Sequence, residues 1–472
     1  MKKIIYIYWG QKFINAPMVV KNCLLSWKIK NPTWKVIELD DDNLCEYINI
    51  EDEIPNINNK NIKKAAYSDI IRIFLLAKYG GLWCDATTYC IKPLDDWLNE
   101  YISKGFFCLR QMKGIQRLIC SYFLYGEENN YIIQKWKEMT VNFWKEKDET
   151  RNYFWFHFLF NKLYKSDNKF KNLWNLTPKQ TRWRSQLLSK ATPEKIEKID
   201  NIIPFYKCTY KYDEKKYTKS TILYYLMNKI NLRLIHIGKT GGTSVKNKFK
   251  LKQYHLNRNY FKNENEYYII WIRNPLKRFV SAFYMSYNLI NMDTSNLNIN
   301  NLTLKNCLAP GRVRFKMTHN NTFSERYDYL INYFKTPNEL AESITSENID
   351  KKKLALELMN SKKEHIFKGI GWYMYDGDFI KKNHDKIIFV GTCENMDDDI
   401  KRLSNLLNYN ISNSNKIREN SSKANDKFLS SKAIKNLIDF YNTDYKALKE
   451  LVNYNFISQD IYESYFSYFH KC

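Results

Sequence analysis

Three segments in the second half of the chain share one pattern: an apolar run, a polar or Gly-containing turn, and then apolar residues at helical spacing. They lie at residues 231–249, 267–284 and 386–407. Strands that alternate with helices in this way are typical of α/β proteins. The repetition therefore predicts an α/β domain with a central parallel sheet in this half.

The first half predicts another α/β domain by the same reasoning. The expected elements are strands at residues 2–9, 33–40 and 82–91, the last with a break in its middle, and helices at residues 17–30 and 63–78. The second helix has apolar residues near helical spacing and is followed by paired glycines, which favours a glycine C-cap. We expect a sheet with helices packed on it here as well.

The restart of the strand pattern near residue 230 predicts a domain boundary. No Gly/Ser-rich or Pro-rich linker separates the halves, so the join is expected to be short. A length of 472 residues has room for two to three domains. The predicted domains are residues 1–228 and 229–472. Asn-rich residues 288–321 predict a long loop or lid, and loops of that length are usually functional or mobile.

The composition excludes several classes of protein. Apolar residues make up 44% of the chain and aromatic residues 16%, which excludes global disorder. No run of about 18 uncharged apolar residues is present to span a bilayer. The first residues predict a strand and lack a signal-peptide cleavage site. We therefore expect a cytoplasmic protein whose ten scattered cysteines are reduced.

The charge is strongly positive, with 75 Lys and Arg against 50 Asp and Glu, a net charge of +25. The basic residues are dispersed, and no nucleic-acid module signature is present. Compositional bias with phosphate-binding pockets is therefore favoured, and no nucleic-acid partner is expected. The alternative, a nucleic-acid binder, would show a steeply salt-dependent affinity. The charge would also favour peripheral association with the inner membrane face.

Charged residues gather around the predicted second helix and the strand after it. Asp69 and Arg72 are three residues apart and share one helix face. Asp85 is expected at the C-terminal end of a strand, where α/β sheets bind ligands. A carboxylate there could bind a divalent ion that neutralises a diphosphate leaving group. The alternatives are a surface ion pair for Asp69 and Arg72, and a turn or cap role for Asp85.

The segment SDIIRIFLLAKYGGLWCDATTYCIKPL, with IYWGQ near the start and NYFWFHFLF around His157, resembles DXD-type glycosyltransferases, and most closely the capsular polysaccharide synthesis family. The resemblance covers about residues 1–227. It implies a GT-A-like (Rossmann-like) fold, a nucleotide-sugar donor (a UDP- or GDP-sugar) and retaining transfer to a glycan or lipid-linked oligosaccharide acceptor. It also implies a Mn²⁺ or Mg²⁺ ion on Asp85. The implied donor-binding residues are Trp9, Asp69, Arg72, Gly81, Asp85 and Thr87.

This sequence departs from the D-x-D pattern, because Thr87 stands where the second Asp would be. A hydroxyl ligates a metal ion more weakly than a carboxylate does, which leaves open a degenerate, glycan-binding N-terminal module. His157 could reach the site, and the alternative is a core residue.

A Gly-rich turn in the second half predicts a phosphate site. Residues 235–244 (IHIGKTGGTS) join an apolar strand to a helix, and backbone N–H groups at a helix N-terminus bind phosphate. The loop is not a Walker A loop, because its lysine precedes the paired glycines. The expected ligands are Lys239, Thr240, Gly241, Gly242, Thr243 and Ser244.

A second phosphate site is predicted where the next strand ends. Arg273 ends that strand, and Ser281 follows eight residues later in a helix, so that a guanidinium and a hydroxyl converge. Pro275 suits the first turn of that helix. Arg278 is expected to be a structural ion-pair residue instead.

HIGKTGGTS resembles the 5′-phosphosulfate loop of carbohydrate sulfotransferases that use 3′-phosphoadenosine 5′-phosphosulfate (PAPS), and RNPLKRFVSAFY resembles their 3′-phosphate motif. The resemblance covers about residues 232–451, with Gly238 in place of the family's Pro. It implies a P-loop-like fold and attack of a sugar hydroxyl on sulfur, with Lys239 stabilising the leaving oxygen. The candidate general bases are His255 and then His319. Ser421 or Lys423 could close over the nucleotide.

Together these features predict a bifunctional enzyme of bacterial surface or capsular polysaccharide synthesis: a glycosyltransferase fused to a carbohydrate sulfotransferase. One alternative is a sulfotransferase with a degenerate N-terminal module. Another is a P-loop nucleotide kinase, which the position of the lysine disfavours. The oligomeric state stays open.

Overall fold

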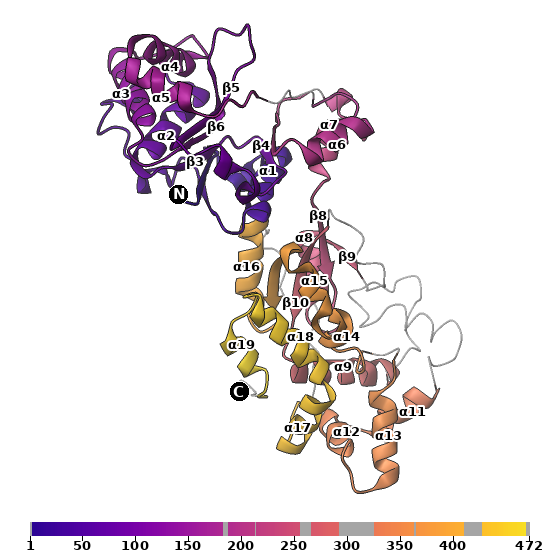
Figure 1. Ribbon diagram of the computed structural model, residues 1–472. Helices are drawn as coiled ribbons and strands as arrows, with labels where there is room; N and C mark the ends of the chain where they lie inside the picture. Colours follow the sequence, from indigo (N-terminus) through magenta and orange to yellow (C-terminus); the bar gives the residue numbers. More distant parts are fainter. Residues whose placement is uncertain are drawn as a thin grey trace. The chain divides into compact units, whose positions relative to one another are not determined.

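The computed structural model describes residues 2–182, 187–212, 214–254, 266–291, 325–362, 365–409 and 427–468. The chain divides into two compact units (Figure 1). The N-terminal unit comprises Met1–Ile230 and Leu406–Asn408, and the C-terminal unit comprises Asn231–Asn405 and Tyr409–Cys472. This division falls two residues after the boundary proposed from the sequence.

Within the described residues, the main sheet of the N-terminal unit has five strands in the order β2-β1-β3-β6-β5. Strand β1, the second in this order, is parallel to β2 on one side and to β3 on the other, whereas β6 is antiparallel to both β3 and β5. The sheet is therefore mixed. The strand bounds are β1 Ile4–Tyr8, β2 Lys35–Leu39, β3 Gly81–Cys84, β5 Phe106–Arg110 and β6 Ile119–Gly126.

The connecting helices of this sheet are α1 (Met18–Lys30) and α2 (Lys64–Tyr79), which confirms both helices expected in this half. Gly80 ends α2 with φ +65°, and its N–H donates to the carbonyl of Leu76 at 3.0 Å. A side chain is strained at that φ, so glycine suits this C-cap. The chain then enters β3.

Further helices pack beside α2. Figure 1 shows α3, α4 and α5 grouped together, and their aromatic rings pack closely: Trp136 of α3 stacks on Phe156 of α4 with centroids 3.9 Å apart. A separate two-stranded antiparallel ribbon joins β4 to β7. The bounds are β4 Thr88–Cys90, β7 Phe205–Lys207, α3 Tyr131–Glu146, α4 Trp155–Ser166, α5 Asn168–Leu176, α6 Pro193–Asn201 and α7 Ile222–Met227.

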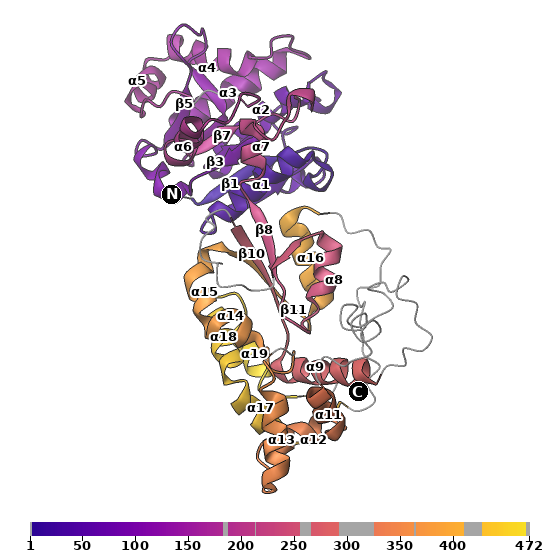
Figure 2. The ribbon, with the colours of Figure 1, turned by 90° about the vertical axis from the view of Figure 1, so that its right-hand side faces the viewer.

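The sheet of the C-terminal unit has the order β11-β10-β8-β9 in the described residues, and every pairing is parallel. This confirms the parallel sheet expected from the repeated strand–turn–helix pattern. Figure 2 shows α8 and α16 on one side of this sheet and α14, α15 and α18 on the other. The strands are β8 Asn231–Ile235, β9 Lys252–Tyr254, β10 Glu266–Ile272 and β11 Ile387–Thr392.

The helices that follow the strands are α8 (Gly242–Phe249), α9 (Pro275–Ile290) and α16 (Met396–Leu407). The other helices of the unit pack mainly against α9 and one another. They are α11 Glu325–Tyr333, α12 Pro337–Ser343, α13 Ile349–Met359, α14 Ile370–Met374, α15 Asp378–Asn383, α17 Ser431–Phe440, α18 Asn442–Asn453 and α19 Gln459–Ser464.

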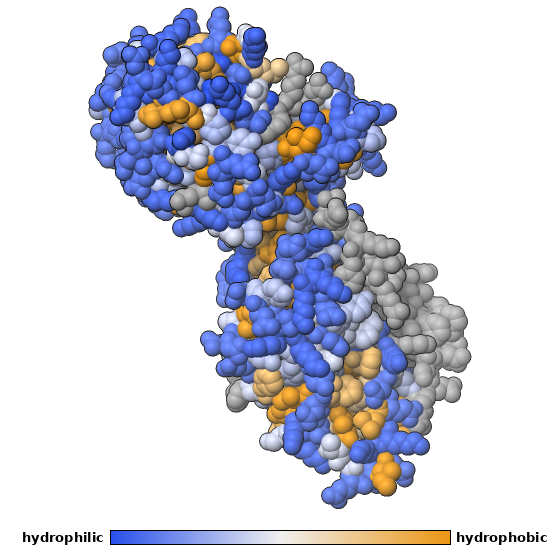
Figure 3. All heavy atoms as spheres, in the orientation of Figure 1, coloured by the Kyte–Doolittle hydropathy of each residue, from blue (hydrophilic) through white to orange (hydrophobic). Residues whose placement is uncertain are grey.

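The surface is mainly hydrophilic on the face drawn in Figure 3, with apolar residues scattered over it. Among the residues that the structure describes, no helix is both long and apolar enough to cross a membrane. Six of the eight described cysteines are buried.

Candidate functional site

The topology of the N-terminal sheet marks one strand edge as a place for a ligand. From β1 the chain moves to β2 on one side and later returns to β3 on the other. Ligands of open α/β sheets bind at such a switch point, beyond the carboxyl ends of the strands. Trp9 follows β1 and Asp85 follows β3, so both lie at this edge.

A buried ionic chain leads from α2 to Asp85. The Nη2 atom of Arg72 lies 3.1 Å from Asp69 Oδ1 and 3.3 Å from Asp85 Oδ1. The Nη1 atom of Arg72 donates to the carbonyl of Ser121 at 2.6 Å, and the guanidinium lies 5.1 Å from the ring centre of Trp83. The i,i+3 pair anticipated between Asp69 and Arg72 is therefore present, but it is buried and reaches a third residue.

Asp85 is held as a carboxylate by two cations. Its Oδ2 atom accepts from the Lys207 ammonium at 2.7 Å, and its Oδ1 atom accepts from the Trp83 indole N–H at 2.9 Å. Burial alone would raise the pKa of Asp85, but Lys207 and Arg72 hold it well below its ordinary value. Asp85 therefore stays ionised at any physiological pH.

Lys207 also binds Thr87, the residue at the second position of the expected metal site. The Lys207 Nζ atom donates to Thr87 Oγ1 at 2.8 Å. The side chains of Asp85 and Thr87 thus converge on an ammonium group. No group of three His, Cys, Asp or Glu side chains suited to a metal ion occurs among the described residues. The donor set around Asp85 therefore does not fit the Mn²⁺ or Mg²⁺ ion expected from the sequence.

The protonation of two further buried groups is shifted. Burial raises the pKa of Asp69 to about 7, although Arg72 opposes the shift. His157, on α4, is 8% exposed, and burial together with the charges of Arg72 and Arg117 lowers its pKa to about 3. His157 is therefore a neutral, aromatic-flanked residue beside the ionic chain. Its burial agrees with the alternative that it is a core residue.

The other implied donor residues are not all brought to this edge. The Trp9 ring packs edge-on against Tyr210, with centroids 5.1 Å apart. Gly81 begins β3, at the end of the strand opposite Asp85, with φ +108°. A Cβ atom on Gly81 would lie 3.0 Å from the carbonyl oxygen of Ile4, so the strand pairing accounts for this glycine.

Sequence reasoning missed Lys207. It lies within the apolar run IPFYKC, and a charged residue in a strand that is otherwise apolar is the available signal. Its partner Thr87 is 120 residues away in the chain, so the contact depends on the pairing of β7 with β4.

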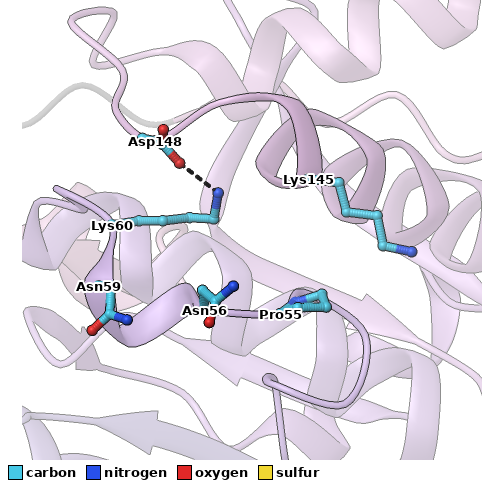
Figure 4. Close-up of a pocket in the computed structure, with 6 residues that line it drawn as sticks. All are labelled: Pro55, Asn56, Asn59, Lys60, Lys145 and Asp148. Carbon is cyan, nitrogen blue, oxygen red and sulfur yellow. Dashed lines mark hydrogen bonds and ion pairs between the residues drawn. The ribbon is translucent and has the colours of Figure 1, made fainter.

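A separate hollow of about 510 Å³ occurs in the N-terminal unit, and none of the implied donor residues lines it. In Figure 4 the Lys60 ammonium reaches Asp148, and the two groups lie 2.7 Å apart. The lining residues are Pro55, Asn56, Asn59, Lys60, Lys145 and Asp148.

The parallel sheet of the C-terminal unit has a switch point of the same kind. The chain passes from β8 to β9 on one side, and from β10 to β11 on the other. The loop after β8 and the residue after β10 therefore meet at one strand edge. Arg273 follows β10 directly, and its Nη1 atom donates to the carbonyl of Lys239 at 3.3 Å. The structure thus brings together the two segments expected to bind phosphate.

The loop after β8 has the backbone of a tight strand-to-helix turn. Lys239 has φ +70° and Gly241 has φ +83°, and α8 begins at Gly242. The Thr240 hydroxyl donates to the carbonyl of Ile237 at 3.0 Å, which braces the turn from within. Burial and then the charge of Arg273 lower the pKa of Lys239 to about 8. Two cations at the start of a helix form an arrangement that favours an anion.

The paired glycines leave no room for side chains. A Cβ atom on Gly241 would lie 2.4 Å from Met396 Cε, and one on Gly242 would lie 2.7 Å from His236 Cδ2. The next residue, Thr243, has its Oγ1 atom 3.3 Å from His236 Nε2. The remaining expected ligands lie on helices, Ser244 in the first turn of α8 and Ser281 on α9.

Gly238 has no room for a side chain either. A Cβ atom on Gly238 would lie 2.3 Å from His365 Nδ1, so a proline does not fit beside this imidazole. Burial, together with nearby cations that include Lys239, lowers the pKa of His365 to about 3. His365 was not anticipated, because it is more than 100 residues from the loop.

Arg278 is a structural residue, as expected. Its side chain is fully buried, its Nη1 atom donates to the carbonyls of His365 and Lys368 at 2.9 and 3.0 Å, and its Nε atom lies 3.9 Å from Asp444 Oδ2. Pro275 is the first residue of α9, again as expected, and the Asn274 side chain caps this helix. The residues His255, His319, Ser421 and Lys423 lie outside the described residues.

Comparisons with known proteins bear on the N-terminal unit. Residues 1–226 match the family described as capsular polysaccharide synthesis protein. A curated relative, the O-glycosyltransferase braB of Annulohypoxylon truncatum, is 24% identical over 160 residues, which is 30% of this chain and 38% of the relative. The chain thus spans little more than a third of that relative.

A match to a solved structure, the PaToxG glycosyltransferase, covers 37% of this chain and 72% of the chain of that structure. The sequence identity is 15% and the TM-score is 0.27. That similarity is too weak to support an argument about the fold. The family match shows that the chain is similar over residues 1–226 to the capsular polysaccharide synthesis family. The curated relative bears the name of an O-glycosyltransferase.

Proposed function

We propose that the N-terminal unit transfers a glycosyl group from a nucleotide-sugar donor to a glycan acceptor. The observation that carries the proposal is the ionic chain of Asp69, Arg72, Asp85 and Lys207 at the switch point of the sheet. The similarity of residues 1–226 to the capsular polysaccharide synthesis family supports it. The donor is a UDP- or GDP-sugar, and the acceptor is a glycan or a lipid-linked oligosaccharide.

The residues at this edge have different roles in the proposed reaction. Arg72 is fixed by the Ser121 carbonyl and by two carboxylates, so it orients Asp85 rigidly. The exposed part of Asp85 accepts hydroxyl groups of the donor sugar, because an ionised carboxylate only accepts hydrogen bonds. The Trp9 ring offers a flat apolar surface for the base.

The test is hydrolysis of UDP- and GDP-sugars by the full chain, measured as nucleoside diphosphate release. We expect the reaction to stop in Asp85→Ala and to continue in Asp148→Ala, a control at a surface ion pair. Folded wild-type protein that releases no nucleoside diphosphate from a broad panel of donors would overturn the proposal. It would favour a glycan-binding module.

We propose for the C-terminal unit a sulfuryl transfer from PAPS to a sugar hydroxyl. The observation in support is the meeting of Lys239 and Arg273 at the switch point between β8 and β10. Lys239 would stabilise the leaving phosphate oxygen, and Arg273 with Ser281 would hold the 3′-phosphate. A nucleotide kinase fits this loop less well, because the lysine precedes the glycines.

Calorimetric titration with adenosine 3′,5′-bisphosphate tests this second proposal. We expect tight binding by the wild type and by Lys401→Ala, which removes one exposed positive charge from the same unit. The affinity should fall at least tenfold in Arg273→Ala. Absence of binding to folded wild-type protein would overturn the assignment, and turnover of ATP would favour the kinase alternative.

If both units are active, the fusion would let one enzyme add a sugar and sulfate the same glycan. This coupling predicts faster sulfation of the product of the N-terminal unit than of the unglycosylated acceptor. Equal rates on the two acceptors would contradict it. If the acceptor is lipid-linked, we expect the basic chain to associate with anionic membranes. Sedimentation with anionic vesicles at low and high salt would test this association.

A further inference from the structure

The ammonium group of Lys207 suggests a role within the proposed glycosyl transfer, and this inference rests on that proposal. The Lys207 Nζ atom lies 2.7 Å from Asp85 Oδ2 and 2.8 Å from Thr87 Oγ1. These are the first and third side chains of the triplet Asp85-Ala86-Thr87, to which the sequence assigned a metal ion. A covalently attached cation therefore lies between the two side chains that would have held the ion.

The backbone fixes this ammonium in place. Lys207 ends β7, where it pairs with Thr88 of β4, and the N–H of the next residue, Cys208, donates to the Thr87 carbonyl at 2.7 Å. The lysine stem then crosses only a short distance to the triplet, and its ammonium lies 5.4 Å from the ring centre of Tyr122. A strand ladder, and not a mobile loop, positions the charge.

The charges around Asp85 leave Lys207 able to receive an anion. Arg72 pairs with Asp69 and faces one oxygen of Asp85, and Lys207 faces the other oxygen of Asp85. An ammonium group has three N–H donors. The described structure gives two of them to Asp85 and Thr87, and the Lys207 side chain is still 28% exposed. The third donor is available for a phosphate oxygen that enters from solvent.

We propose that the Lys207 ammonium replaces the divalent ion, binds the donor diphosphate and stabilises the charge on the leaving nucleoside diphosphate. In the transfer, the bond between the anomeric carbon and the phosphate oxygen breaks, and its electron pair stays on that oxygen. The acceptor hydroxyl oxygen forms the new bond to the anomeric carbon. The hydroxyl proton passes to the departing diphosphate, so atoms and charge balance.

The first measurement is calorimetric binding of UDP and GDP to the full chain in EDTA, with and without added Mn²⁺. We expect the wild type to bind one of the two nucleotides in EDTA with an affinity that Mn²⁺ changes less than threefold. The affinity should fall at least tenfold in Lys207→Met. Lys92→Met is the matched control, because its ammonium extends from the same ribbon region to the Asn201 carbonyl.

The second measurement is nucleotide-sugar hydrolysis by the same proteins. We expect EDTA to leave the wild-type rate unchanged, and Lys207→Met to lower kcat by about 100-fold to 1,000-fold, the usual loss when one charge-stabilising donor is removed. Lys207→Arg keeps the charge and should retain more activity than Lys207→Met. This variant keeps the test valid if Lys207→Met fails to fold.

Two results would overturn the inference alone: wild-type activity that is lost in EDTA and restored by Mn²⁺, or a wild-type rate in folded Lys207→Met. A wild type that binds neither nucleotide and cleaves no nucleotide sugar would instead overturn the proposed glycosyl transfer, and this inference with it. The outcomes are therefore distinguishable.

Discussion

The sheets of the two units each have a switch point, but the cations beside the two switch points have different partners. At the edge of the N-terminal sheet, Arg72 and Lys207 are already paired with the carboxylates Asp69 and Asp85. At the edge of the C-terminal sheet, Lys239 lies beside the cation Arg273, which donates to its backbone carbonyl. A switch point therefore determines where a ligand binds, whereas the ion pairs around it determine how much positive charge is left for the ligand.

The largest effect should come from removing one member of the paired network. Arg72→Met leaves two carboxylates buried without their common cation, so we expect a loss of about 3–5 kcal/mol in the free energy of unfolding. Urea unfolding followed by tryptophan fluorescence measures it. Arg273→Met, which removes a neighbouring like charge from Lys239, should cost less than about 1 kcal/mol. Equal costs for the two variants would break the comparison.

A steric change in the C-terminal loop should have the next largest effect. Gly238→Pro would place its ring carbons against His365, where a Cβ atom alone comes within 2.3 Å. We expect a loss of about 1–3 kcal/mol, as for overpacked sites. The same substitution with His365→Ala should recover part of it, because a proline still lacks the Gly238 N–H that bonds to Tyr373. A double variant no more stable than Gly238→Pro alone would show that the imidazole does not exclude the proline.

The carboxyl group of Asp69 should make the free energy of unfolding depend on pH. Its pKa of about 7 in the folded protein lies above the value of about 3.9 for an unfolded chain. The folded state therefore binds more protons between these values. This stabilising contribution is complete below about pH 4 and is lost as the pH rises through 7. The slope is at most about 1.4 kcal/mol per pH unit.

Asp69→Asn has no carboxyl group at this position, so it should flatten the pH dependence of the unfolding free energy between pH 4 and 7. The control is Asp148→Asn, because the Asp148 side chain is 86% exposed. Urea midpoints at five pH values make the comparison. An unchanged slope in Asp69→Asn would contradict the assigned titration.

The smallest expected effect is the uptake of a fraction of a proton by Lys239 when the nucleotide binds. Lys239 has a pKa of about 8, so part of the population is neutral at pH 8.5. A bound phosphate would raise this pKa, and binding would then draw a fraction of a proton from solution. Calorimetry of adenosine 3′,5′-bisphosphate binding in two buffers of different ionisation enthalpy measures it. Lys239→Arg, which stays charged, should show no uptake, and equal uptake in both proteins would contradict the assignment.

Local patterns were enough to predict much of the fold. The apolar spacing and terminal signals of α1 and α2 were visible in the sequence, as was the break between β3 and β4. The three strand–turn–helix segments indicated the parallel sheet of the C-terminal unit. Each of these signals depends on neighbouring residues only, and that is why each could be interpreted without the structure.

Contacts between distant segments could not be predicted in the same way. Asp69 and Arg72 were paired by their spacing, but Lys207 reaches Asp85 only through the register of β7 on β4. The family resemblance implied a donor-binding role for Gly81, whereas its φ and its closeness to β1 explain a glycine there. The imidazole of His365, which explains Gly238, likewise comes from a remote segment.

The most direct test of two distinct sites is the rate of nucleoside diphosphate release from a nucleotide sugar by Asp85→Ala and Arg273→Ala, side by side with the wild type. The account predicts that release stops in Asp85→Ala and continues at the wild-type rate in Arg273→Ala. Release that survives in Asp85→Ala, or that is lost equally in both folded variants, would contradict it.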